Sequence, residues 1–92
     1  MAATEAVALR FGSNLLRARR DVALSQEQAA LRAGLHRTEV GLLEHGGRTP
    51  RIDTLLRLSA AVECDPGRLL YGIEWAPAAE SAAGAFYIMG GE

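Results

Sequence analysis

Residues 25–44 decide the fold, and their sequence is SQEQAALRAGLHRTEVGLLE. Ser25 and Gln28 have the spacing of a capping box, in which each side chain bonds to the backbone N–H of the other residue at a helix start. Gly34 is expected to end this helix, because glycine adopts the left-handed conformation of a helix C-terminus at little cost. The inner face of the helix consists of small residues, which let another helix approach closely: Ala29, Ala30 and Ala33.

A second helix is predicted over residues 36–45. His36 begins it, and Val40 and Leu43 are expected to point inward at a spacing of three. The apolar Leu35 is expected to plug the turn between the two helices. Two short helices joined by a tight turn that contains glycine form a helix-turn-helix motif.

A long amphipathic helix is predicted before this motif. Thr4 is expected to cap its start, and the helix should end near Val22 or Ala23. Gly12 lies inside it and marks either fraying or close packing. The apolar stripe recurs at spacings of three and four, as one face of a helix requires, and consists of Val7, Phe11, Leu15, Ala18 and Val22.

Two further helices are predicted after the motif. The fourth helix follows a loop at residues 48–50, and the fifth begins at Asp65-Pro66, with aspartate as the N-cap and proline at the first helical position. After Trp75 the chain becomes rich in alanine, serine and glycine, and residues 86–89 form a short β-prone patch. We therefore expect an all-α protein, with a compact five-helix bundle over residues 4–75 and an Ala/Gly-rich C-terminal extension over residues 76–92.

The charges are unevenly distributed along the chain. The formal net charge is -1, which is unlike the strong basicity of a protein that coats nucleic acid without specificity. All ten basic residues are arginines between Arg10 and Arg68, whereas three of the eleven acids lie in residues 73–92. The body therefore carries a small positive charge, which indicates a polyanionic partner only weakly.

The composition also limits the chemistry. Cys64 is the one cysteine, and a single thiol makes neither an internal disulfide nor a zinc site. No third ligand stands at a suitable spacing from His36 and His45, so we predict no metal and no cofactor. No catalytic series or glycine-rich phosphate loop is present, so we predict no enzyme. The sequence shows neither the pattern of a signal peptide nor an apolar stretch of transmembrane length, so we expect a cytoplasmic location.

The motif and its surroundings resemble the Xre/Cro family of helix-turn-helix regulators, which includes phage repressors and restriction-modification controller proteins. The resemblance runs from about Phe11 to Leu70. It is carried by Leu24-Ser25-Gln26, Ala30, Gly34, Val40, Leu43-Glu44, Gly46, Pro50 and Leu55. It implies a lambda-repressor-like bundle that binds double-stranded DNA, with the helix at about residues 36–45 in the major groove.

The resemblance also implies particular DNA contacts. Arg37, Thr38 and Leu42 fall at positions that usually face base edges, and an arginine has the reach to bond guanine. The candidate phosphate contacts are Ser25, Gln26, His36, Arg48 and Arg51. The alternative for each polar residue is a solvated side chain or a simple helix cap, and the alternative for Leu42 is packing inside the bundle.

Arg19 and Glu44 fall on the internal ion pair that joins the first and third helices in the family. The sequence departs from the family pattern at four positions, one of which is Leu42, where a polar base-reading residue is common. Gly41 lies inside the recognition helix, Glu39 lies on its DNA-side flank, and Arg51 stands where a serine or aspartate usually caps the fourth helix. These departures concern the details of base reading and not the family.

One such module covers only a few base pairs, so a homodimer on a palindromic operator is expected. The candidate interface residues are Leu69, Tyr71, Ile73, Trp75, Phe86, Tyr87 and Ile88. Residues 86–89 either add a strand across the dimer, pack on the body, or form a flexible tail. The predicted function is a sequence-specific transcriptional regulator. The alternative is an antitoxin or adaptor that uses the same fold to bind a toxin or another protein.

Overall fold

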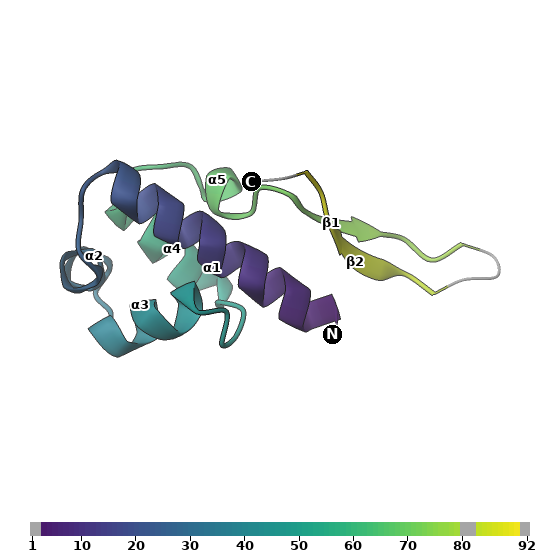
Figure 1. The fold of residues 1–92 in the computed structure, drawn as a ribbon, viewed down its shortest axis with the longest axis horizontal. Coiled ribbons are helices and arrows are strands. Elements are labelled where there is room, and N and C mark those ends of the chain that lie inside the picture. The colour runs from purple at the N-terminus through teal and green to yellow at the C-terminus, as the bar shows by residue number, and fades with distance from the viewer. Residues whose placement is uncertain (1–2, 80–82, 91–92) are drawn as a thin grey trace.

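The computed structural model describes residues 3–79 and 83–90, which form an elongated molecule with five helices and a two-stranded hairpin (Figure 1). The helices are α1 (Ala3–Asp21), α2 (Gln26–Ala33), α3 (Arg37–Glu44), α4 (Ile52–Ala61) and α5 (Pro66–Leu69). The strands are β1 (Ile73–Ala76) and β2 (Ala85–Ile88). In Figure 1 the helices form the body, and the hairpin extends from it on the side away from α2.

One hydrophobic core lies between the helices. The α1 helix packs against α3 and α5, while α2 packs against both α3 and α4. The largest fully buried side chains are Phe11, Leu15, Val40, Leu43, Leu58, Val62 and Leu69. They come from α1, α3, α4 and α5 and from the residue that follows α4, and α2 adds the buried Ala29, Ala30 and Ala33. Burial of these residues holds the helices together by the hydrophobic effect.

The local signals in residues 25–36 are confirmed. The Ser25 hydroxyl accepts a hydrogen bond from the Gln28 amide at 3.0 Å, and the Gln28 side chain accepts one from the Ser25 amide at 2.8 Å. Gly34 ends α2 in the left-handed region at φ 70°, and Leu35 packs against the core. His36 occupies the N-cap of α3 but makes no side-chain capping bond. The His36 side chain is exposed.

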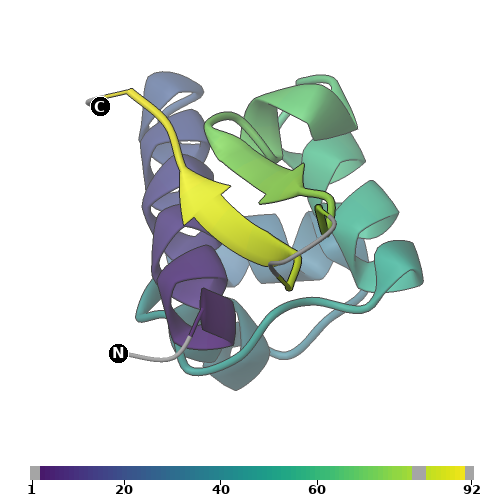
Figure 2. The same cartoon turned by 90° about the vertical axis from the view of Figure 1, so that its right-hand side faces the viewer.

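Two expectations at the chain ends are corrected. Thr4 lies within α1 and so is not its cap. The description as all-α is also incomplete, because β1 and β2 pair in an antiparallel sheet with Ile73 opposite Ile88 and Trp75 opposite Phe86. Residues 85–88 thus pair within their own chain, and β2 lies alongside α1 (Figure 2). A short hairpin is marginal alone, so this packing and the contact of the Trp75 and Phe86 rings, whose centroids are 4.9 Å apart, stabilise it.

Gly12 is a position of close packing and not of fraying. It is buried, and a Cβ atom built there would lie 2.4 Å from the Leu43 carbonyl oxygen and 2.5 Å from that of Glu44. These distances are far below normal contact, and both atoms belong to the backbone. The absence of a side chain at Gly12 therefore sets how closely α1 approaches the end of α3.

We predict that Gly12→Ala lowers the free energy of unfolding by about 1–3 kcal/mol, because the backbones of α1 and α3 must move apart. Urea unfolding followed by circular dichroism would measure the loss. Gly67→Ala is the matched control, since nothing lies within 4 Å of a Cβ atom at that position. Equal stability of the Gly12 variant and the wild-type protein would contradict the close approach of the helices.

Candidate nucleic-acid interface

The α3 helix divides its side chains between the core and the solvent. Val40 and Leu43 are buried in the core, whereas Arg37 and Thr38 are exposed on the first turn. Leu42 is 40% exposed, so it does not pack inside beside Leu43, which is 0% exposed. The three residues predicted to read bases therefore all have exposed side chains on one short helix.

An ion pair fixes the end of α3 to α1. The Arg19 guanidinium donates from Nε to Glu44 at 2.6 Å and from a terminal nitrogen to the second carboxylate oxygen at 3.0 Å. The side chains of Arg19 and Glu44 are 11% and 4% exposed, and their hydrogen bond raises the pKa of Arg19, although burial opposes this. Arg19 also donates to the Leu24 carbonyl at 2.8 Å. The pair thereby holds the turn before α2 as well as both helices.

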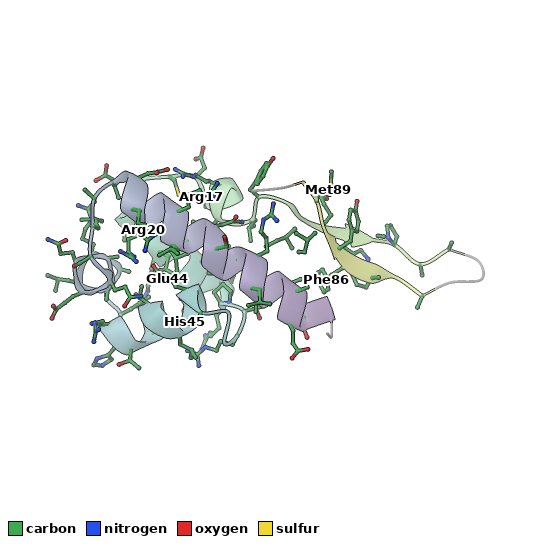
Figure 3. The ribbon with its side chains drawn as sticks, in the orientation of Figure 1. Arg17, Arg20, Glu44, His45, Phe86 and Met89 are labelled. Atoms are coloured by element: carbon green, nitrogen blue, oxygen red, sulfur yellow. The ribbon has the colours of Figure 1, made fainter. Side chains whose placement is uncertain are left out.

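Gln26 joins this network from the start of α2. Its amide nitrogen donates to Glu44 at 2.9 Å, and the side chain lies over Gly41, where a Cβ atom would be 3.7 Å from the Gln26 oxygen. A primary amide carries two hydrogens, so one remains for another acceptor. Figure 3 shows Glu44 between α1 and α3, and His45 just beyond it. The network places Gln26 at the junction of the two motif helices.

The two arginines after α3 each have an acidic neighbour. Arg48 donates to the Glu39 carboxylate at 3.0 Å, and the Arg51 guanidinium lies 3.3 Å from Asp53. Arg51 is the N-cap of α4 without a side-chain capping bond, as the sequence indicated. The sequence did not predict either pair. The Glu39–Arg48 pair joins residues nine positions apart, so it depends on the course of the chain after α3.

The candidate dimer residues fall into different environments. Leu69 is fully buried in the core, so its assignment to a surface seam is wrong. Ile73 and Ile88 are half-buried and face each other across the sheet. The large exposed apolar side chains around the hairpin are Leu70, Tyr71, Trp75, Phe86, Tyr87 and Met89. Leu70 was not predicted, although it adjoins two predicted residues in the sequence, and Met89 was predicted only as the end of the segment 86–89.

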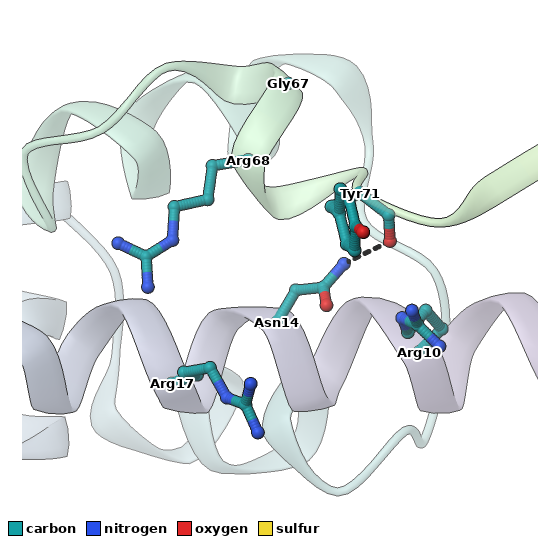
Figure 4. Close-up of a pocket in the computed structure, with 6 residues that line it drawn as sticks. All are labelled: Arg10, Asn14, Arg17, Gly67, Arg68 and Tyr71. Carbon is teal, nitrogen blue, oxygen red and sulfur yellow. Dashed lines mark hydrogen bonds between the residues drawn. The ribbon is translucent and has the colours of Figure 1, made fainter. Parts of the chain in front are cut away.

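An open hollow of about 500 Å³ lies between α1 and α5 and is lined by Arg10, Asn14, Arg17, Gly67, Arg68 and Tyr71 (Figure 4). Asn14 donates to the Leu69 and Tyr71 carbonyls at 3.0 and 2.9 Å, and Arg68 pairs with Asp21. The polar groups that line this hollow thus already join α1 to α5 and to the residues after it.

In the described ranges, no three His, Cys, Asp or Glu residues form a metal-binding group. None of the helices described here is long and apolar enough to cross a membrane.

The fold and this surface define a helix-turn-helix DNA-binding domain. Comparison with known families supports this class, because residues 15–69 match the HTH_3 helix-turn-helix model. This is more than half of the chain, which therefore belongs to this Xre/Cro-like family of DNA-binding transcriptional regulators. The sequence resemblance to that family is confirmed.

Individual relatives point the same way. The restriction-modification controller protein C.AhdI from Aeromonas hydrophila is 35% identical with a TM-score of 0.68, over 71% of this chain and 94% of that one. The P22 c2 repressor, solved with a synthetic operator, is 25% identical with a TM-score of 0.61, over 65% and 91%. An uncharacterized HTH-type transcriptional regulator, y4dJ, from Sinorhizobium fredii is 39% identical over 51 residues, which are 55% of this chain and 66% of that protein. The chain thus spans slightly less than two thirds of this last relative.

We predict that Glu44→Gln lowers the free energy of unfolding by about 3–5 kcal/mol, because it leaves the Arg19 charge buried without its partner. Thermal or urea unfolding would measure the change. Glu63→Gln is the matched control, since its pair with Arg32 at 3.2 Å is exposed and is worth about 1 kcal/mol at most. Equal losses in the two variants would show that the buried pair has no special role.

Proposed function

We propose that this protein is a sequence-specific transcriptional regulator that binds its operator as a homodimer, with α3 in the major groove. The observation that carries the proposal is the exposed face of α3, held rigidly at its far end by the Arg19–Glu44 pair. An α-helix fits the major groove, where each base pair presents a distinct pattern of donors and acceptors. A rigid helix with exposed polar side chains can therefore distinguish sequences.

The first turn of α3 supplies the proposed base contacts. Arg37 can donate two hydrogen bonds to the O6 and N7 atoms of guanine, a contact worth about 1–3 kcal/mol of discrimination. Thr38 and Leu42 can meet thymine methyl groups, because the two residues are four positions apart and share a helix face. The exposure of all three side chains supports these roles.

The proposed phosphate contacts surround this face. The first amides of α2 and the Ser25 hydroxyl at its N-cap form an anion-binding end, to which Gln26 adds its second amide hydrogen. His36 is exposed at the N-cap of α3, and Arg48 and Arg51 follow the helix. Such contacts fix the register of the protein on DNA while the base contacts specify the sequence.

The exposed apolar group around the hairpin supports a homodimer. Tyr71, Trp75 and Tyr87 are each about half exposed, and aromatic residues are enriched at protein interfaces. A two-fold dimer would present two α3 helices to two half-sites of one operator. The alternative is that a toxin or another protein covers this surface. The mass measurement described below distinguishes the two cases.

We expect the double variant Arg37→Ala, Thr38→Ala to lose specific binding while retaining weak binding to random DNA. The measurement is a gel shift with DNA selected from a random pool, together with the DNA upstream of the gene. Arg32→Ala is the matched control, because Arg32 lies at the last turn of α2 and pairs with Glu63. Wild-type protein that binds selected and random DNA equally at moderate salt would overturn the proposed function.

We also expect a dimeric mass in light scattering at micromolar concentration, and a shift toward the monomer in Tyr71→Ser. The exposed Leu31 at the α2 surface provides the control Leu31→Ser, which should leave the mass unchanged. A monomeric wild-type protein would contradict the homodimer, and a stable complex with a different protein would favour the adaptor function.

A further inference from the structure

The Glu39–Arg48 pair lies on the surface proposed to meet DNA. Glu39 belongs to the first turn of α3, directly after Arg37 and Thr38, whereas Arg48 follows the end of the helix. One guanidinium nitrogen of Arg48 is 3.0 Å from the Glu39 carboxylate, and the side chains are 56% and 29% exposed. The pair therefore spans one flank of α3 from its first turn to the loop beyond it.

A DNA phosphate and the Glu39 carboxylate would compete for the same guanidinium. Both are anions that accept charge-assisted hydrogen bonds from arginine. An arginine already neutralised inside the protein gains little when it exchanges one anion for another, and the released carboxylate then faces the phosphates. Glu39 should therefore oppose the phosphate contact that the position of Arg48 otherwise favours.

We propose that Glu39 is an intramolecular competitor of DNA phosphate for Arg48 and that it lowers the affinity of the α3 surface for DNA of any sequence. This inference rests on the proposed DNA-binding function. Among the acids near this surface, Glu39 differs from Glu44, which is buried and holds Arg19. It also differs from Asp53, whose contact with Arg51 lies within the N-terminus of α4.

An acidic side chain in a recognition helix can instead accept a hydrogen bond from the amino group of cytosine. The geometry favours competition over base reading, because the carboxylate is directed to the loop after α3 and is bound there by Arg48. The two roles predict opposite effects of removing the charge. Competition predicts tighter binding to all DNA, whereas base reading predicts weaker binding to sites with one particular cytosine.

The test is Glu39→Gln, which keeps the shape of the side chain and removes its charge. Binding to a short random-sequence duplex and to the selected operator would be measured by fluorescence anisotropy over a range of salt concentrations. Both duplexes should bind more tightly by up to about fivefold, which is the scale of an exposed ion pair. The slope of log K against log salt should steepen by up to about 0.9, the value for one additional phosphate contact.

Arg48→Ala provides the second arm of the experiment. If Glu39 acts through Arg48, Glu39→Gln should give little gain when Arg48 is already absent. An equal or larger gain in that background would mean direct repulsion between Glu39 and DNA, and would overturn the proposal. Glu63→Gln, which breaks an exposed pair with Arg32 instead, should not change DNA affinity or the salt slope.

The remaining outcomes separate this inference from the proposed function. Wild-type protein that binds its operator, together with an unchanged Glu39→Gln variant, would overturn only the competitor role. Loss of binding confined to sites with a cytosine at one position would replace it with base reading. A wild-type protein that binds no DNA would overturn both proposals.

Discussion

The carboxylate of Glu44 joins three separate parts of the chain. It receives two hydrogen bonds from Arg19 near the end of α1 and one from Gln26 at the start of α2, while Glu44 itself ends α3. An ion pair removed from water contributes little unless its geometry is good and its other hydrogen-bonding groups are satisfied. Here no buried side-chain nitrogen or oxygen in the described residues lacks a partner. The orientation of α3 in the body depends on this arrangement.

Small residues bring the helices close enough for this bond to form. Gly12 allows the α1 backbone to approach the carbonyls of Leu43 and Glu44, and Ala29, Ala30 and Ala33 allow α2 to pack closely on its neighbours. A side chain at Gly12 would press on the backbone of Leu43 and Glu44, which is the end of α3 that carries the 2.6 Å hydrogen bond to Arg19. Close packing and the ion pair therefore act on the same contact between α1 and α3, and both fix the position of α3.

The sequence predicted the features that depend on near neighbours. The capping box at Ser25 and the left-handed Gly34 follow from local backbone chemistry, and the Arg19–Glu44 pair followed from the family resemblance. The hairpin was not predicted. Residues 86–89 were β-prone, but their partner strand, Ile73–Ala76, begins four residues after α5 ends and was predicted as part of the helical body. Pairing between distant segments depends on tertiary packing that a short window does not contain. Glu39 and Arg48 were likewise recognised individually, but their contact depends on the turn after α3.

The charges at the α3 surface bear on how such a protein could select DNA. Arg48 and Arg51 are each beside an acid, whereas Arg37 forms no ion pair with any described residue. Because the chain carries a net charge of only -1, general attraction to phosphates is small, and such attraction supplies essentially all non-specific binding. With Arg37 at the proposed base-reading position, such a surface would bind random DNA weakly and would still have one arginine available for the proposed contact with guanine. Two such surfaces in a dimer would then add their base contacts, so that affinity comes from the operator sequence more than from bulk charge.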